Sequence, residues 1–144
     1  MSYISIWLHC VWSTKNRIPY LTDRIRSEVI SHIYHNAKSK GIYLDQMNGY
    51  HEHLHALISM SGTQNISEIM QKIKGESSFW INKKKLTRLK FEWQDDFYCV
   101  SIGQSQMENL KIYIRDQEVH HKKVSWEEVL EKLIKENNLL RIVD

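Results

Sequence analysis

Hydrophobic and polar residues repeat along the chain with two different periods. Four short segments alternate in the manner of half-buried strands, and longer segments between and after them repeat apolar residues at helical spacing. Gly41 ends the first helical segment, and Ser125 with Glu128 forms a capping box before the last. We therefore expect strands over residues 4–12, 42–48, 53–60 and 97–102, and helices over about 22–40, 66–85, 107–121 and 125–135.

The order of these elements is βαββαβ followed by two helices, without repeats, low-complexity segments or long linkers. This order predicts a ferredoxin-like α+β sandwich, in which two helices pack on one face of an antiparallel four-stranded sheet. The first and third strands are then central neighbours. A chain of 144 residues is long enough for one domain, spanning residues 1–144. The second helix is expected to face the sheet with Ile66, Ile69, Met70, Ile73, Phe79 and Trp80.

The third strand carries two histidines at alternate positions. Alternate strand residues share a face, so His53 and His55 lie side by side, about 7 Å apart along the strand. Two imidazoles at this spacing can bind one divalent ion together with oxygen donors, although the same spacing also suits polar residues on an exposed face. In the ferredoxin-like arrangement the two packing helices leave this face open. His9, on the neighbouring strand, lies either beside a metal or in an ordinary hydrogen bond.

The helix expected over residues 107–121 has an unusual polar stripe. Tyr113 and Gln117 are one turn apart, and His120 continues the same face. An ordinary packing helix has no need of such a stripe. Each residue alone also has a plain interpretation: a half-buried packing tyrosine, an unremarkable helix glutamine, and surface or phosphate-contacting histidines at His120 and His121.

Charge changes this picture only slightly. The net charge of +3 permits binding to a phosphate backbone without requiring it. A basic cluster between residues 72 and 90 fits either nucleic-acid binding or a solvated helix face; it comprises Lys72, Lys74, Lys83, Lys84, Lys85, Arg88 and Lys90.

Composition also bears on location. The apolar segments are far shorter than the roughly 20 residues of a membrane span, and the first residues lack the features of a signal peptide. Cys10 and Cys99 fit no metal-ligand spacing and are typical of buried thiols in a reducing compartment. We therefore expect a cytoplasmic protein without a membrane partner.

Two motifs resemble those of a known family. The segment His53-Leu54-His55 resembles the His-hydrophobic-His motif of the HUH endonucleases. Tyr113 with Gln117 resembles the catalytic helix of the single-tyrosine (Y1) transposases of the IS200/IS605 type. Supporting segments occur in the family's order at residues 9–17, 74–78, 93–94 and 113–121. One local departure is His51-Glu52, where the family often has Pro-Asp; Glu52 keeps the acid, and His51 has no assigned role.

The resemblance implies a chemistry for these residues. Tyr113 is expected to attack a phosphodiester of single-stranded DNA, forming a 5′-phosphotyrosine that is later rejoined to a new end. His53, His55 and Gln117 are expected to bind Mg²⁺ or Mn²⁺. The expected partner is single-stranded DNA with hairpin element ends, contacted by Lys15, Arg17, Lys74, Lys83, Lys84, His120 and His121.

A homodimer is also expected. Residues 103–105 form a flexible joint before the Tyr113 helix, which could dock on its own histidine pair or on the partner's. The resemblance implies shared sites for mobile elements and monomers for domesticated copies.

Two alternatives stay open. One is a domesticated nuclease that cuts a fixed chromosomal repeat. The other is a non-catalytic ferredoxin-like module that binds nucleic acid through aromatic residues on an open sheet face.

Overall fold

The chain forms a four-stranded antiparallel sheet in the order β2-β3-β1-β4. The structure is a computed structural model that describes residues 2–121 and 124–137. The two central strands, β1 and β3, pair along their whole length, with Val11 opposite His55. The predicted fold class is therefore confirmed. The strands are β1 (Trp7–Ser13), β2 (Tyr43–Gly49), β3 (His53–Ser59) and β4 (Tyr98–Ser101).

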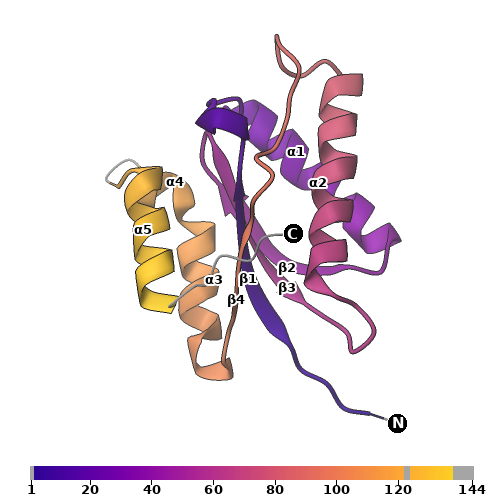
Figure 1. Ribbon diagram of the computed structural model, residues 1–144, viewed down its shortest axis with the longest axis vertical. Coiled ribbons are helices and arrows are strands. Elements are labelled where there is room, and N and C mark those ends of the chain that lie inside the picture. The colour runs from indigo at the N-terminus through magenta and orange to yellow at the C-terminus, as the bar shows by residue number, and fades with distance from the viewer. Residues whose placement is uncertain (1, 122–123, 138–144) are drawn as a thin grey trace.

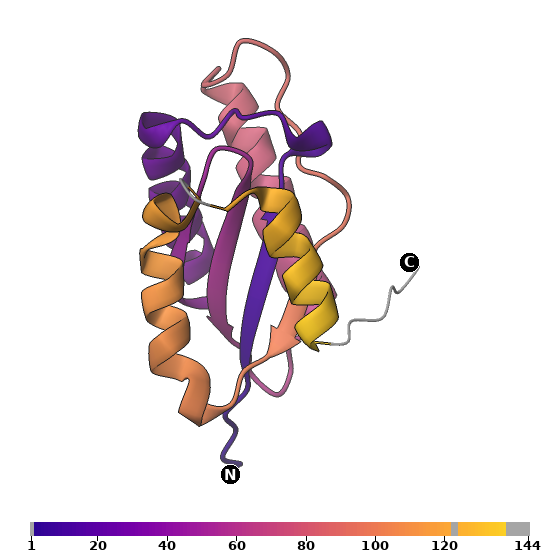
Figure 2. The same ribbon diagram turned by 90° about the vertical axis from the view of Figure 1, so that its left-hand side faces the viewer.

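Helices cover both faces of the sheet (Figure 1). The pair α1 (Asp23–Ser39) and α2 (Ile66–Lys83) lies on one face. The opposite face carries α3 (Met107–Arg115), α4 (Gln117–His121) and α5 (Trp126–Asn137) (Figure 2). Two short 3₁₀ turns, η1 (Lys15–Arg17) and η2 (Gln104–Gln106), follow β1 and precede α3. None of the described helices is long and apolar enough to cross a membrane.

The main core lies between the sheet and the first helix pair. Leu54, Ala56 and Ile58 point from β3 into this layer, and Leu8, Cys10 and Trp12 do so from β1. The Cys10 and Cys99 thiols are hydrogen-bonded neighbours across β1 and β4, with their sulfurs 3.7 Å apart. Burial of this apolar layer supplies most of the driving force for folding.

Two local predictions about the first strand and the second helix are wrong. The first strand begins at Trp7 rather than residue 4, and the Tyr3 and Ile4 side chains are exposed. Phe79 does not face the sheet, because at about 100° per residue it lies about 120° around the helix from Ile73. Its side chain is 66% exposed, and Ser77 and Ile81 occupy the inner positions.

The helix predicted over residues 107–121 is two helices. The backbone leaves helical geometry at Asp116, with φ −96° and ψ 22°. The carbonyl oxygen of Arg115 accepts a hydrogen bond from Asn48 Nδ2 on β2, at 2.8 Å, instead of continuing a helix. The break therefore has a tertiary cause.

The histidine face of the sheet is also not open, contrary to the prediction. Apolar residues of α3 and α5 close it in two small clusters, and both strand histidines are fully buried. The clusters are Leu57 with Met107 and Ile114, and Val11 with Trp126 and Val129.

Candidate active site beneath the C-terminal helices

His53 and His55 lie side by side on β3, as the alternation of strand residues predicts. Their ring centroids are 5.0 Å apart. The turn that leads into β3 requires a glycine at position 49, because a Cβ there would overlap the carbonyl oxygen of His53. The tight turn therefore brings the first histidine directly to the start of the strand.

Each histidine is held through its Nδ1 atom. Glu52 Oε1 lies 2.8 Å from His53 Nδ1, and His9 Nε2 lies 2.9 Å from His55 Nδ1. His9 comes from β1, and burial lowers its pKa to about 4, so that it is neutral at pH 7. A partner at Nδ1 fixes the ring and directs Nε2 toward a ligand, which is the usual arrangement around metal-binding histidines.

Gln117 reaches the histidines because the helix breaks one residue before it. Its side chain is fully buried. The amide Nε2 donates a hydrogen bond to the carbonyl oxygen of Tyr113 at 3.0 Å, and Oε1 lies 3.5 Å from His53 Nε2. The hydrogen bond orients the amide, so its oxygen faces the histidine pair.

Tyr113 is half-buried and packs edge-to-face on histidine rings. Its ring centroid lies 5.5 Å from that of His55 and 5.2 Å from that of His120. Burial raises the pKa of Tyr113 above its usual 10, and a hydrogen bond with Gln117 opposes this shift. The phenol is therefore protonated at neutral pH. His120 faces the tyrosine, and its pKa is lowered by burial and by the charge of Lys132.

Two contacts fasten the Tyr113 and Gln117 segment to its own body. Arg26, buried in α1, pairs with Glu118 of α4 at 2.6 Å. The Asn48–Arg115 hydrogen bond anchors the end of α3 to β2. Within one chain, the tyrosine, the glutamine and the histidines thus form one cluster.

Four residues of this cluster were not assigned from the sequence. They are His9, Glu52, Arg26 and Trp126; the Trp126 ring stacks on His53 with centroids 4.3 Å apart. The sequence placed His9 on the neighbouring strand but left its role open, and the structure shows it hydrogen-bonded to His55. No comparable signal exists for Arg26 and Trp126, because their contacts span elements distant in the sequence. His51 stacks on Tyr50, at 4.1 Å between ring centroids.

The cations predicted to contact DNA lie in different settings. Lys83 and Lys84 are exposed at the end of α2. Lys15 pairs with Glu92 at 3.4 Å, and Arg17 pairs with Glu127.

Lys74 has a structural partner instead of an open surface. Its ammonium group donates to the carbonyl oxygens of Gln94 and Asp95, at 2.6 and 2.9 Å, and burial lowers its pKa. The side chain of His121 lies outside the described residues.

The donor types of the predicted ligands, and the one ligand-to-ligand distance between His53 and Gln117, suit a divalent ion. Among the described residues, no three histidine, cysteine, aspartate or glutamate side chains form a metal-binding group, and the third ligand predicted from the sequence is the amide of Gln117. Two ligands bonded to one ion at about 2.1 Å lie about 3–4 Å apart. The 3.5 Å between His53 Nε2 and Gln117 Oε1 matches this separation. Imidazole nitrogen and amide oxygen are suitable donors for Mn²⁺ or Mg²⁺.

Fold and site together describe a ferredoxin-like domain with a tyrosine beside a His-hydrophobic-His pair. The chain belongs to the IS200-like transposase family, whose model matches residues 2–117. This range includes Tyr113 and Gln117. No curated protein matches the chain.

Two solved structures share the fold. One is a crystal structure of a candidate transposase of Deinococcus radiodurans R1, with a TM-score of 0.66 and 16% identity over 81% of this chain and 93% of that one. The other is a REP-associated tyrosine transposase bound to a REP hairpin, with a TM-score of 0.65 and 16% identity over 100% of this chain and 92% of that one.

Proposed function

We propose that this transposase cleaves and rejoins single-stranded DNA through a 5′-phosphotyrosine intermediate on Tyr113, with a divalent metal at His53, His55 and Gln117. The observation that carries the proposal is the meeting of Gln117 with His53, 64 residues apart in sequence, beside Tyr113. Family membership supports the transposase function itself.

Tyr113 supplies the nucleophile in this proposal. Its hydroxyl oxygen forms a bond to the scissile phosphorus as the bond to the 3′ oxygen breaks; the phenol proton passes to solvent and the released 3′ oxygen takes up a proton, which leaves a free 3′-hydroxyl. A raised pKa makes the free phenolate scarce at pH 7, so attack and proton loss must be coupled. Reversal by a 3′-hydroxyl of another strand restores the phosphodiester without a nucleotide cofactor.

The two histidines and Gln117 would hold Mg²⁺ or Mn²⁺. When bound there, the ion would polarise the scissile phosphate and stabilise its transition-state charge. Glu52 and His9 fix the histidine rings through Nδ1, and the Tyr113 carbonyl fixes the amide. With only three protein ligands, coordination positions are left for water and a phosphate oxygen.

The proposed substrate is single-stranded DNA with a hairpin end. A relative of the same fold was solved with a REP hairpin. Exposed Lys83 and Lys84 can supply salt-dependent backbone contacts. The non-catalytic alternative requires an exposed sheet face, whereas α3 and α5 cover that face here.

The homodimer stays a prediction, and the contacts favour sites in cis. Exchange of the Tyr113 helix would have to break the Arg26–Glu118 and Asn48–Arg115 contacts. Mixing Tyr113→Phe with His53→Ala/His55→Ala subunits tests this point. A site in cis leaves the mixture inactive; a shared site restores part of the activity, once subunit exchange has been verified by native mass spectrometry.

A covalent adduct tests the proposed function. The protein is incubated with labelled single strands that cover the DNA flanking its gene, with Mn²⁺ or with EDTA. We expect a denaturant-resistant protein–DNA adduct with Mn²⁺ that EDTA abolishes. Tyr113→Phe should bind the same strands and form no adduct, and Tyr43→Phe serves as the matched control. An undiminished adduct from Tyr113→Phe would refute the assignment.

A further inference from the structure

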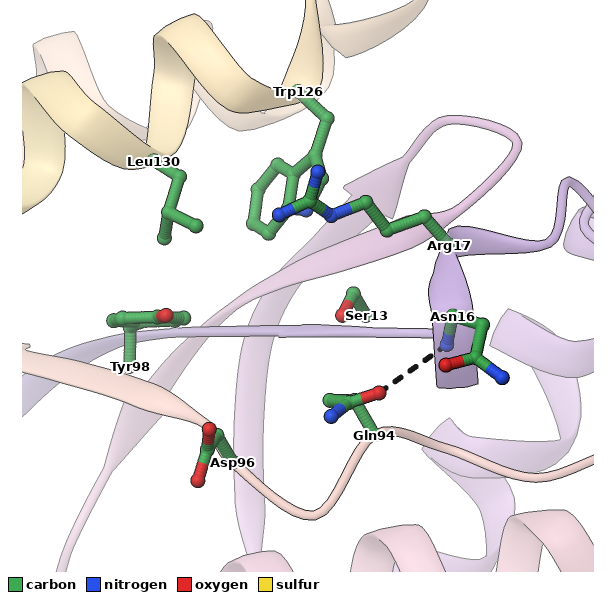
Figure 3. A pocket seen from close by; sticks show the side chains of 8 residues that line it. All are labelled: Ser13, Asn16, Arg17, Gln94, Asp96, Tyr98, Trp126 and Leu130. Carbon is green, nitrogen blue, oxygen red and sulfur yellow. Dashed lines mark hydrogen bonds between the residues drawn. The ribbon is translucent and has the colours of Figure 1, made fainter.

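A hollow of about 440 Å³ lies between α5 and the β4 edge of the sheet (Figure 3), and Trp126 in its wall stacks on His53 of the histidine cluster. We propose that it binds one unpaired nucleobase of the DNA strand, a step that rests on the proposed function. Its volume lies within the range of about 300–1,000 Å³ that is usual for small-molecule sites. The residues that argue for a base are Tyr98, Trp126, Leu130, Asn16, Arg17 and Gln94.

Flat apolar surfaces line two sides of this pocket. Trp126 and Leu130 descend from α5, and the Tyr98 ring lies across from them on β4 (Figure 3). All three belong to the small apolar cluster around Val11. A planar base can enter between such surfaces, and stacking on aromatic side chains contributes about 1–3 kcal/mol per base.

One end of the pocket carries amide groups that suit a base edge. The backbone N–H of Asn16 donates to Gln94 Oε1 at 3.2 Å (Figure 3). Because Oε1 accepts this bond, the Gln94 Nε2 group is oriented to donate to a ligand. Asn16 lines the same end of the pocket, and an amide such as that of Gln94 offers both a donor and an acceptor to the edge of a base.

The loop at this end is held in an uncommon conformation. Asn16 and Arg17 both have φ near +57°, in the left-handed region that bulky residues rarely occupy. Thr14 Oγ1 donates to the Ile18 carbonyl at 2.7 Å, and the Lys15 N–H donates to the Glu92 carbonyl at 3.0 Å, so the surroundings enforce the turn. Strain of this kind concentrates at binding and catalytic sites.

Charge favours a base inside the pocket with its phosphate at the mouth. Asp96 lines the hollow, and its carboxylate would repel a phosphate but accept a hydrogen bond from a base amino group. Arg17 also lines the pocket and pairs with Glu127 of α5. One indole forms both the pocket wall and the cover of His53, since Trp126 stacks on that ring. A base in the pocket is therefore held close to the proposed cleavage site.

Photocrosslinking and affinity test this inference. The probe is a fluorescein-labelled dT12 strand with 5-iodouracil at its centre, and crosslinked peptides are identified by mass spectrometry. We expect crosslinks at Tyr98 or Trp126. Tyr98→Leu should weaken binding about 5- to 150-fold, the equivalent of one lost stacking contact. Tyr43→Leu, on the opposite edge strand, is the matched control and should bind normally.

A second variant keeps the result interpretable if Tyr98→Leu disturbs α5. Gln94→Ala leaves the apolar cluster intact and should weaken binding several-fold. Crosslinks confined to residues 72–90, together with unchanged affinity for both variants, would overturn the pocket. If the wild-type protein still forms the Tyr113 adduct in that case, only the pocket fails. If Tyr98→Leu weakens binding but no adduct forms, the pocket stands and the proposed function fails.

Discussion

The two faces of the sheet differ in what their side chains do. The face under α1 and α2 is a continuous apolar layer, whereas the face under α3, α4 and α5 has small apolar clusters around a buried polar group. Strand β3 serves both faces, with Leu54 and Ala56 on one and His53 and His55 on the other. Stability and chemistry are thus separated by the alternation of a single strand.

The polar face carries a cost that the apolar face does not. Buried imidazoles and amides must be hydrogen-bonded, since each unsatisfied group costs about 1–3 kcal/mol. Glu52, His9 and the Tyr113 carbonyl provide such bonds. The same bonds that stabilise the buried polar groups also orient them for binding a metal.

Substitutions at two neighbouring β3 positions, one on each face, should have the largest and most different effects on cleavage and on stability. His53→Ala should reduce adduct formation more than about 100-fold, because a direct ligand matters more than the outer-shell groups worth 10–100-fold. Leu54→Ala should lower the free energy of unfolding by about 2–5 kcal/mol, while its folded fraction still cleaves. Urea unfolding and the adduct assay measure both. If folded His53→Ala and folded Leu54→Ala lost cleavage equally, the two faces would not have the separate roles proposed for them.

Acid should lower the free energy of unfolding of the metal-free protein, because His9 is buried on the polar face. His9 has a folded pKa of about 4 and an ordinary unfolded value near 6.5. The unfolded chain therefore binds the extra proton between these values, so stability falls as the pH falls from 6.5 to 4. The loss attributable to His9 is up to about 3 kcal/mol. The free energy of unfolding, measured with urea in the presence of EDTA at several pH values in this range, should depend less steeply on pH in His9→Asn than in the wild-type protein. An unchanged pH dependence would exclude His9 as the cause.

His9 should also affect metal binding without being a ligand. Loss of the bond to His55 Nδ1 frees that ring to rotate, and outer-shell partners of this kind are worth about 10–100-fold in metal affinity. Calorimetric titration with Mn²⁺ should show this decrease for His9→Asn. His35→Asn, an exposed histidine on α1, is the control. Equal Mn²⁺ affinity in His9→Asn and the wild-type protein would remove His9 from the site.

The smallest effect should come from the Arg26–Glu118 pair that fastens α4. Glu118 is half exposed and Arg26 keeps a second partner in Asp23, so Glu118→Gln should lower stability by about 1 kcal/mol or less. Relative to the wild-type protein, Glu118→Gln should nevertheless speed amide hydrogen exchange in α4 and leave the exchange rates in α2 unchanged. Uniformly faster exchange across both helices would mean that the pair stabilises the whole fold instead of the site.

The apolar face could be predicted from the sequence, but much of the polar face could not. Alternation along β3 and helical spacing in α1 report directly on burial, which is why the histidine pair was foreseen, and the βαββαβ order of the elements predicted the two central strands. The break at Asp116 was not, because its cause is a hydrogen bond from Asn48 in a distant strand. The cover over the histidines was also missed, since the apolar clusters of α3 and α5 are too small to stand out in the pattern.

We propose above that Tyr113 and the β3 histidines form one catalytic site. Peptide mass spectrometry of the nuclease-trimmed adduct tests this claim most directly. We predict that the peptide containing Tyr113 carries a nucleotide joined through its 5′ phosphate, and that His53→Ala lacks this modified peptide while remaining folded. A nucleotide on any other residue, or one joined through its 3′ phosphate, would contradict it.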